Sequence, residues 1–286
     1  MVGKPVITIG LDLAPHLAFA SMRAALAGVC LLAFGVVTRR PIPRTGRFWV
    51  LVTVIAIGAT SFGFFGMFHA AEFISPGLAT VVANMQPLLA ATMAYAILGE
   101  RLSLIGRFGL LVGFAGIVVI AWPGLAYGGV PGYAAGIAYV SLAAASVAVG
   151  NLAIARLAAQ ADAIMAMAFQ LLIGAVPLAA VSILTEDVST VTWSGEFILV
   201  LWSLSVLGTS LPFLLWFEAL AVTELSRANA FTFLVPIFGL VIGAAVFEER
   251  LEWAHAVGVT LVLAGLLLVQ HRSDVRNAHR ATSTRV

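Results

Sequence analysis

The sequence predicts an all-α membrane protein with a ten-helix, five-plus-five inverted-repeat architecture, whose first helix is largely absent from this chain. Three observations lead to this fold class. The 286 residues are 62% hydrophobic and 10% charged, with a mean hydropathy of +1.07. Arginines gather between alternate apolar stretches, and much of the first half of the chain recurs in the second half. Because so few charges cannot cover so much apolar surface in water, the solvent of this fold must be lipid.

Long apolar runs predict nine full membrane spans, since about 20 residues of helix cross a hydrocarbon core. The predicted spans cover residues 14–37, 48–71, 76–98, 104–122, 131–157, 163–185, 197–220, 228–247 and 253–270. The connections between them are short, so we expect no inserted soluble domain.

Charge placement predicts the orientation of these spans. Twelve arginines share one side: Arg39, Arg40, Arg44, Arg47, Arg101, Arg107, Arg156, Arg227, Arg272, Arg276, Arg280 and Arg285. The other side holds Lys4 and Arg250 with eight carboxylates: Asp12, Glu72, Glu186, Asp187, Glu196, Glu248, Glu249 and Glu252. By the positive-inside rule the arginine side is cytoplasmic. The tail at 272–286 is then a disordered cytoplasmic end, and its arginines are topology signals rather than a nucleic-acid-binding patch.

An internal repeat relates the two halves at an offset of 149 residues. Matched segments include Thr60-Ser61 with Thr209-Ser210, Phe64 with Phe213, Pro87 with Pro236, and Glu100-Arg101-Leu102 with Glu249-Arg250-Leu251. The predicted repeats cover residues 1–123 and 130–271. Their matched ends lie on opposite sides of the membrane, so the repeats are inverted, an arrangement found in secondary transporters.

The repeat also indicates a missing helix. The image of the span at 131–157 would begin before Met1, and only its end, roughly residues 2–9, is present. We therefore expect the intact protein to have ten helices with both termini in the cytoplasm. An in-frame apolar segment upstream of this chain would support this expectation, and a stop codon within the preceding twenty codons would contradict it.

Two long motifs resemble a known family. MQPLLAATMAYAILGERLS at 85–103 and LVPIFGLVIGAAVFEERLE at 234–252 are similar to the paired proline and glutamate-arginine signatures of the EamA family, in the drug/metabolite transporter superfamily. The resemblance covers the whole chain except the absent first helix, and the sequence as a whole further resembles a bacterial amino-acid exporter of that family. It implies a central cavity lined by the first, third, fourth, sixth, eighth and ninth helices and opened alternately to each side.

Polar residues inside spans are costly, so each is a candidate site residue. Thr80, Asn84 and Pro87 share one helix face at i, i+4 and i+7, and the proline leaves a backbone carbonyl free beside the Asn84 amide. This face is predicted to bind the ammonium or carboxylate of a zwitterion. Interhelical hydrogen bonding of Asn84 is the alternative.

The repeat images of this face are Asn229, Phe233 and Pro236. The amide of the first repeat is thus replaced by an aromatic ring while the proline is kept, which predicts an asymmetric cavity. Gln86 lies off the face and is expected to pack.

A second polar stripe joins Ser61, Phe65 and His69 at i, i+4 and i+8, and the image of His69 is Glu218. We predict His69 near the outer end and Glu218 near the inner end as two symmetry-related gate residues. Histidine also titrates near neutral pH. Snorkelling of both side chains to the interface is the alternative.

Aromatic residues on candidate lining helices predict the apolar wall of the site. Phe65, Tyr139, Trp202 and Phe233 are the predicted wall residues, because aromatic faces suit aromatic or thioether side chains and also bind cations. Packing and interfacial anchoring are the alternatives. Arg23 lies about ten residues into its span and needs a partner. A substrate carboxylate is one candidate, and backbone carbonyls of a neighbouring helix are the favoured one.

Two other patterns are interpreted as structural. The pairs Glu100-Arg101 and Glu249-Arg250 lie at helix ends, where they are expected to cap carbonyls or form surface ion pairs. Glycines four residues apart at 109–113, 132–136 and 239–243 predict close helix packing.

Motifs that would indicate an enzyme are absent from the sequence. It has no GxxxxGK[ST] loop, HExxH motif, Cys/His cluster or GxSxG elbow, and Lys4 is its only lysine. We therefore predict neither enzymatic activity nor a cofactor or metal.

The expected function is export of small metabolites, foremost aromatic or other neutral amino acids, across the bacterial inner membrane. A monomer is expected to do this by alternating access, with the two repeats rocking about the substrate. A cationic multidrug exporter, and a channel or lipid scramblase, are the alternatives.

Overall fold

The structure is a computed structural model that describes residues 6–70, 72–74, 79, 82–100, 102–125, 132–235, 237–238 and 253–270. These residues contain helices and no strand. The elements are α1 Val6–Leu13, α2 His16–Val37, α3 Gly46–Ile55, η1 Ala56–Phe62, α4 Gly63–Ala70, α6 Gln86–Met93, η2 Ala94–Leu98, α7 Leu104–Leu125, α8 Tyr133–Leu157, α9 Ala163–Thr185, η3 Val188–Thr190, α10 Gly195–Ser205, η4 Val206–Ser210, α11 Leu211–Val222, α12 Leu225–Ala230, η5 Phe231–Leu234 and α14 Trp253–Gln270. The predicted all-α fold class is confirmed.

Five apolar helical stretches in the described ranges are long enough to cross a membrane. They are His16–Val37, Gly46–Ala70, Ala134–Leu157, Ala163–Thr185 and Gly195–Val222. Each corresponds to a predicted span, and shorter apolar helices lie at Gln86–Leu98, Leu104–Val119 and Ala256–Val269. The predicted spans at 76–98 and 228–247 fall partly outside the described residues. The chain is thus a multi-pass membrane protein.

The helices form two compact units. Unit 1 contains Met1–Ile74 and Pro131–Thr223, and unit 2 contains Ser75–Val130 and Glu224–Val286. Each unit therefore combines segments from both predicted repeats, so the compact units differ from the ranges 1–123 and 130–271.

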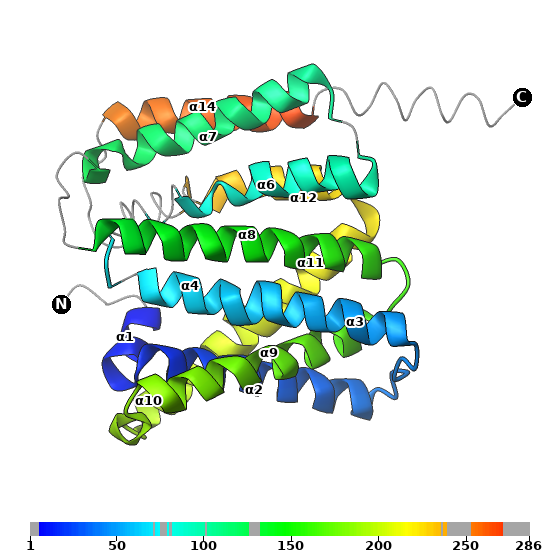
Figure 1. The fold of residues 1–286 in the computed structure, drawn as a ribbon, viewed down its shortest axis with the longest axis vertical. Helices are drawn as coiled ribbons and strands as arrows, with labels where there is room; N and C mark the ends of the chain where they lie inside the picture. Colours follow the sequence, from blue (N-terminus) through cyan, green and yellow to red (C-terminus); the bar gives the residue numbers. More distant parts are fainter. Residues whose placement is uncertain are drawn as a thin grey trace, which may run out of the picture. The chain divides into compact units, whose positions relative to one another are not determined.

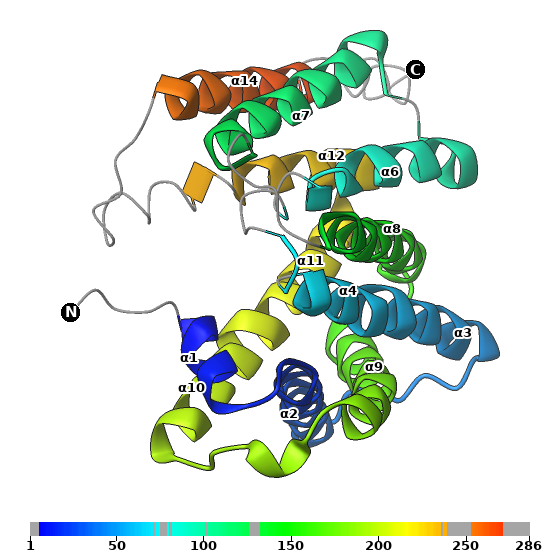
Figure 2. The same ribbon diagram turned by 60° about the vertical axis from the view of Figure 1, so that its left-hand side comes forward.

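Within each unit, one long helix packs against its own repeat image. In unit 1, α2 lies along α9 (Figure 2), and in unit 2, α7 lies along α14 and α6 along α12 (Figure 1). The 149-residue offset relates α2 to α9 and α7 to α14. Because each of these helices is apolar on most of its surface, pairing with its image buries one face of both.

Close approach of backbones marks two helix interfaces, α7 with α14 and α4 with α8. A Cβ atom built on Gly265 of α14 would lie 2.6 Å from the carbonyl oxygen of Gly109 and 2.5 Å from the amide nitrogen of Gly113 on α7. In unit 1, a Cβ atom on Gly66 of α4 would lie 2.4 Å from the carbonyl oxygen of Tyr139 on α8. The close packing predicted for the glycines at 109 and 113 is confirmed, and those at 239–243 lie outside the described residues.

Two π-helical segments occupy corresponding positions in the repeats. The offset carries Thr60-Ser61 of η1 onto Thr209-Ser210 of η4. The Ser61 hydroxyl donates to the carbonyl oxygen of Ala56, five residues before it, and to that of Gly174 on α9. The Ser210 hydroxyl likewise donates to the carbonyl oxygen of Ser205, five residues before it, and to that of Ala27 on α2. A π-turn widens the helix by one residue, and these hydroxyls take up carbonyls that the widened turn leaves exposed.

Two glutamates each accept hydrogen bonds from the first turn of another helix. Glu186, after α9, accepts from the amides of Leu17 and Ala18 at the start of α2, both at 2.9 Å. Glu100, after η2, accepts from the amides of Leu225 and Ser226 at the start of α12, at 2.9 and 3.0 Å. A helix N-terminus has free N–H groups and a partial positive charge, so both carboxylates are well placed. The structural interpretation of Glu100 is confirmed, but its partners are N–H groups rather than carbonyls. Arg101, Glu249 and Arg250 lie outside the described residues.

Candidate functional site

A cluster of aromatic rings gathers at one end of unit 1. Phe65 and His69 lie one turn apart on α4, and their ring centroids are 4.4 Å apart with planes inclined by 32°. Tyr139 of α8 lies against both rings, with centroids 5.9 Å from Phe65 and 5.3 Å from His69. Phe73, just after α4, stacks on Tyr139 at 6.0 Å and 20°. We call these four side chains the ring cluster.

A second histidine links the ring cluster to two carboxylates. His16, the first residue of α2, meets His69 edge-on with ring centroids 4.9 Å apart, and the two rings approach at 3.4 Å between Nε2 of His16 and Nδ1 of His69. Nδ1 of His16 lies 3.1 Å from Oε1 of Glu186 and 3.6 Å from Oε1 of Glu72. His16, Glu72 and Glu186 thus form a polar edge beside the rings.

The polar edge combines a buried carboxylate with an exposed one. Glu186 is 9% exposed, while Glu72 is 52% exposed and thus accessible from outside the cluster. Glu186 already accepts two backbone amides and, at 2.7 Å, the hydroxyl of Ser182. These fixed donors hold Glu186 in place, and it in turn orients His16.

This arrangement offers both halves of a site for a small zwitterion. Ring faces bind apolar or aromatic side chains and attract cations. A histidine pair provides donors when protonated and an acceptor when neutral. The two rings approach within hydrogen-bonding distance, so a shift of either ring changes the contact between α2 and α4.

The structure brings together three of the predicted site residues, Phe65, His69 and Tyr139. The sequence reasoning missed His16, Glu186 and Phe73. His16 had a usable signal, because it is a polar residue at the end of a predicted span, the same criterion that selected His69. Glu186 had none, because its image at the repeat offset is Val37 and nothing in the sequence pairs it with α2.

Arg23 lies deeper in unit 1, beside the π-turn of η4. Its Nε donates to the Thr209 hydroxyl at 2.7 Å, and its Nη2 donates to the carbonyl oxygen of Gly208 at 3.3 Å. Its guanidinium also lies 5.3 Å from the ring centre of Phe64. These contacts match the favoured structural alternative, in which a neighbouring helix supplies the partners of the buried charge.

The segment of unit 2 that carries the predicted polar face is not one continuous helix. The chain turns at Asn84 and Met85, and α6 begins at Gln86, with Pro87 in its first turn. Proline cannot donate a backbone hydrogen bond, and its ring clashes with the carbonyl four residues before it. The predicted i, i+4, i+7 face therefore crosses a turn at residues 84–85 instead of lying on one regular helix. Asn84 is 9% exposed, and Thr80 lies outside the described residues.

The second polar position, Asn229, is fully buried on α12. Its Oδ1 accepts from Nε2 of Gln86 at 2.6 Å, and its Nδ2 donates to the carbonyl oxygen of Leu225. Gln86, which was expected to pack, thus makes the polar contact between α6 and α12. Such a buried amide pair fixes two helices against each other.

The remaining predicted residues are not part of the ring cluster. Phe233 is 0% exposed and packs in the core of unit 2 with Leu110, Ile117 and Val262. A fully enclosed side chain packs rather than lines an open wall, so its predicted place in the wall was wrong. Trp202 is 55% exposed on α10. Glu218 is exposed on α11, with no ion pair or hydrogen bond to the residues described. Pro236 lies outside the described ranges.

Comparison with known proteins identifies one family and several relatives. The EamA-like transporter family matches residues 3–122 and 134–270. A chloroplastic WAT1-related protein of Arabidopsis thaliana is 28% identical over 87% of this chain, which spans 61% of that protein. A probable amino-acid metabolite efflux pump of Salmonella typhimurium is 28% identical over 97% of this chain and 93% of its own length.

A solved crystal structure superposes with a TM-score of 0.78 at 22% identity, covering 92% of this chain and 91% of the other. At this identity the likeness establishes the shared helical fold.

Proposed function

Because the chain belongs to the EamA-like transporter family, we propose that it exports small neutral amino acids, aromatic ones included, by alternating access across a bacterial inner membrane. Membership of the family and the apolar helices make it a multi-pass transporter. The substrate, the direction and the membrane are what we propose. The arginine-rich side is placed in the cytoplasm by the positive-inside rule.

The observation that carries this proposal is the ring cluster with its polar edge. The faces of Phe65 and Tyr139 supply contact area for an apolar or aromatic side chain. Glu72, which is half exposed, supplies a negative charge for the substrate ammonium, and His16 or His69 supplies a donor for its carboxylate. The Salmonella relative, a probable amino-acid metabolite efflux pump, supports the same substrate class.

His69 has the role of a gate residue in this proposal. It contacts α2 through His16 and α8 through Tyr139, so a shift of α4 changes both contacts together. A carrier must break and remake such contacts in each cycle, and a titratable side chain makes that step sensitive to pH. Replacing His69 by alanine is expected to slow transport. Wild-type rates of His69→Ala between pH 5.5 and 8 would contradict the gate.

The test is flux from liposomes that contain the purified chain. They are loaded in turn with phenylalanine, leucine, a sugar or a quaternary ammonium compound. We expect saturable flux of the two amino acids. The variant Phe65→Leu is expected to raise the KM for phenylalanine about 2- to 10-fold, because an aromatic pair contributes about 0.5–1.5 kcal/mol. The matched control is Phe34→Leu, since Phe34 is 54% exposed in the same unit and outside the ring cluster.

Each other outcome points to a named alternative. Saturable flux of the quaternary ammonium compound without amino-acid flux would favour a cationic-drug exporter. Flux that does not saturate would favour a channel, and flipping of labelled lipids would favour a scramblase. An equal rise in KM for Phe65→Leu and Phe34→Leu would remove the ring cluster from the substrate path.

A further inference from the structure

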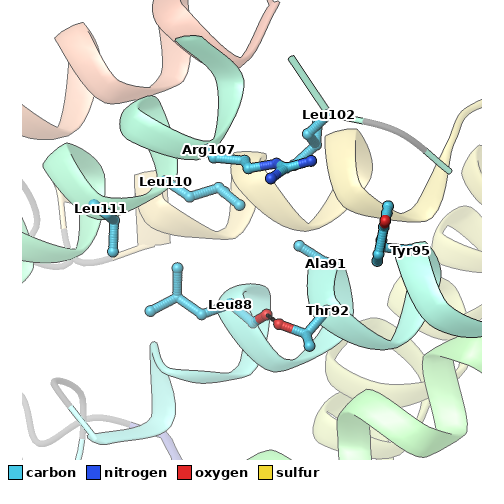
Figure 3. A pocket seen from close by; sticks show the side chains of 8 residues that line it. All are labelled: Leu88, Ala91, Thr92, Tyr95, Leu102, Arg107, Leu110 and Leu111. Carbon is cyan, nitrogen blue, oxygen red and sulfur yellow. Dashed lines mark hydrogen bonds between the residues drawn. The ribbon is translucent and has the colours of Figure 1, made fainter. Parts of the chain in front are cut away.

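Unit 2 carries a groove that the transport proposal does not use. It has a volume of about 430 Å³ and lies between α6 with η2 and the first turns of α7 (Figure 3). Its lining residues are Leu88, Ala91, Thr92, Tyr95, Leu102, Arg107, Leu110 and Leu111. Most of them are aliphatic. The Thr92 hydroxyl already donates a hydrogen bond to the carbonyl oxygen of Leu88 at 2.9 Å. The polar groups left for a ligand belong to Tyr95 and Arg107.

These two polar groups lie toward one end of the groove. Figure 3 shows the Arg107 guanidinium directed toward the Tyr95 side, with Leu88 and Leu111 at the opposite end. The guanidinium carbon lies 5.7 Å from the centre of the Tyr95 ring. The groove thus has a charged end and an aliphatic end, which is the division found in an amphiphile.

Arg107 has no carboxylate partner in the part of the chain that the structure describes. Its side chain is exposed, and its guanidinium contacts the face of Tyr95. A guanidinium has five N–H donors in a planar fork that matches phosphate oxygens. Arg107 also lies in the first turn of α7, where the helix dipole favours a nearby anion. We therefore expect the Arg107 guanidinium to bind an anion that does not belong to this chain.

The surroundings of the groove indicate which class of anion binds in it. Tyr95 and Leu111 are 56% and 58% exposed, on two of the shorter apolar helices. In a multi-pass membrane protein, exposed apolar and aromatic side chains of this kind are suited to contact with lipid. Arg107 belongs to the arginine-rich side, which is cytoplasmic by the positive-inside rule, and anionic lipids give the cytoplasmic leaflet its negative surface potential.

We propose that this groove binds an anionic phospholipid. The lipid phosphate pairs with the Arg107 guanidinium and accepts a hydrogen bond from the Tyr95 hydroxyl, while an acyl chain lies along Leu88, Leu110 and Leu111. The bound lipid bridges α6 and α7. This site is separate from the ring cluster, and its occupancy does not depend on which substrate the protein carries.

The test measures lipid bound to the full-length protein in detergent by native mass spectrometry. Phosphatidylglycerol and phosphatidylcholine with identical acyl chains are titrated in turn. We expect phosphatidylglycerol to bind at least tenfold more tightly than phosphatidylcholine. Equal binding of the two lipids would overturn the charged end of the site without any variant being needed.

Substitutions of single arginines then test whether the phosphatidylglycerol binds in this groove. Arg107→Gln is expected to weaken phosphatidylglycerol binding about tenfold, and Arg107→Lys less, because lysine keeps the charge but loses the fork. The matched control is Arg227→Gln in the same unit, since Arg227 is already paired with Glu224 at 3.2 Å. Equal weakening by Arg107→Gln and Arg227→Gln would indicate diffuse attraction and overturn the groove.

A last measurement separates a lipid from a simple anion. Inorganic phosphate at millimolar concentration is expected to leave phosphatidylglycerol bound, because it gains nothing from the aliphatic end. Displacement of the lipid by inorganic phosphate alone would overturn the role of Leu88, Leu110 and Leu111.

Discussion

Replacing Glu186 by alanine tests how far this carboxylate stabilises the packing of unit 1. The Glu186 carboxylate accepts from the amides of Leu17 and Ala18 and from the hydroxyl of Ser182, and it lies 3.1 Å from His16. Leu17 and Ala18 are 0% and 2% exposed, so water cannot replace the lost acceptor. The variant thus leaves buried donors without partners at the start of α2.

The expected loss of stability follows from these bonds. A buried donor left unsatisfied costs about 1–3 kcal/mol, and loss of an N-cap costs about 0.5–2 kcal/mol. Because the two amides share one carboxylate, the losses do not add in full, and we expect about 3 kcal/mol for Glu186→Ala. Glu186→Gln keeps one carbonyl oxygen as an acceptor, so it is expected to lose about half as much.

The assay is thermal unfolding of the purified protein in detergent. About 3 kcal/mol corresponds to a fall in Tm of roughly 6–12 °C for a chain of this size. The matched control is Glu196→Ala, which removes an exposed carboxylate from the first turn of α10. Substitutions at exposed positions of this kind change stability by about 0.5 kcal/mol or less.

The reasoning fails if Glu186→Ala lowers Tm no more than Glu196→Ala does. It also fails if Glu186→Gln is as damaging as Glu186→Ala, because the retained acceptor would then have no value. The first result would mean that α2 and α9 are held by apolar packing, and the second that a single retained acceptor oxygen does not stabilise the start of α2.

Three further predictions concern packing inside the units, each read from Tm in detergent. Phe233→Ala is expected to cost about 3–5 kcal/mol, because the ring fills the core of unit 2; a loss below about 1 kcal/mol would mean that the ring is not enclosed. Gly66→Val is expected to lower Tm strongly while Gly46→Val does not, because a Cβ on Gly66 meets α8 and one on Gly46 meets nothing; equal effects would contradict the close approach. Gln86→Leu is expected to cost about 1–3 kcal/mol, because it removes the buried hydrogen bond that the Asn229 Oδ1 accepts from Gln86. Adding Asn229→Leu should recover part of that loss, and a simple sum of the two single losses would show that the pair is not coupled.

The sequence alone was sufficient for the fold class and the family. Lipid as solvent forces backbone groups to pair within each span, so apolar runs of span length are helices, and the described part of the chain is helical. The repeat offset also predicted correspondences that the structure bears out in detail. Ser61 and Ser210 make the same pair of carbonyl contacts in η1 and η4, because a local motif was duplicated together with its helix neighbours.

Helix periodicity placed the predicted site residues less well. It assumes that a span is one continuous helix, and that assumption fails at Asn84, where Pro87 requires a break. Helix periodicity also cannot predict how deeply neighbouring helices bury a given helix face. Phe233 and Phe65 are both aromatic residues within spans, yet one is enclosed by a core and the other joins the ring cluster.

Only the tertiary structure brought together His16, His69, Tyr139 and Glu186, which come from four separate segments of unit 1. The physical reason is that a span's sequence specifies its helix and its polarity, while its neighbours are chosen by the packing of whole helix faces. The inverted repeat predicted which segments are alike. The pairing of α2 with α9 and of α7 with α14 inside compact units decided which of them touch.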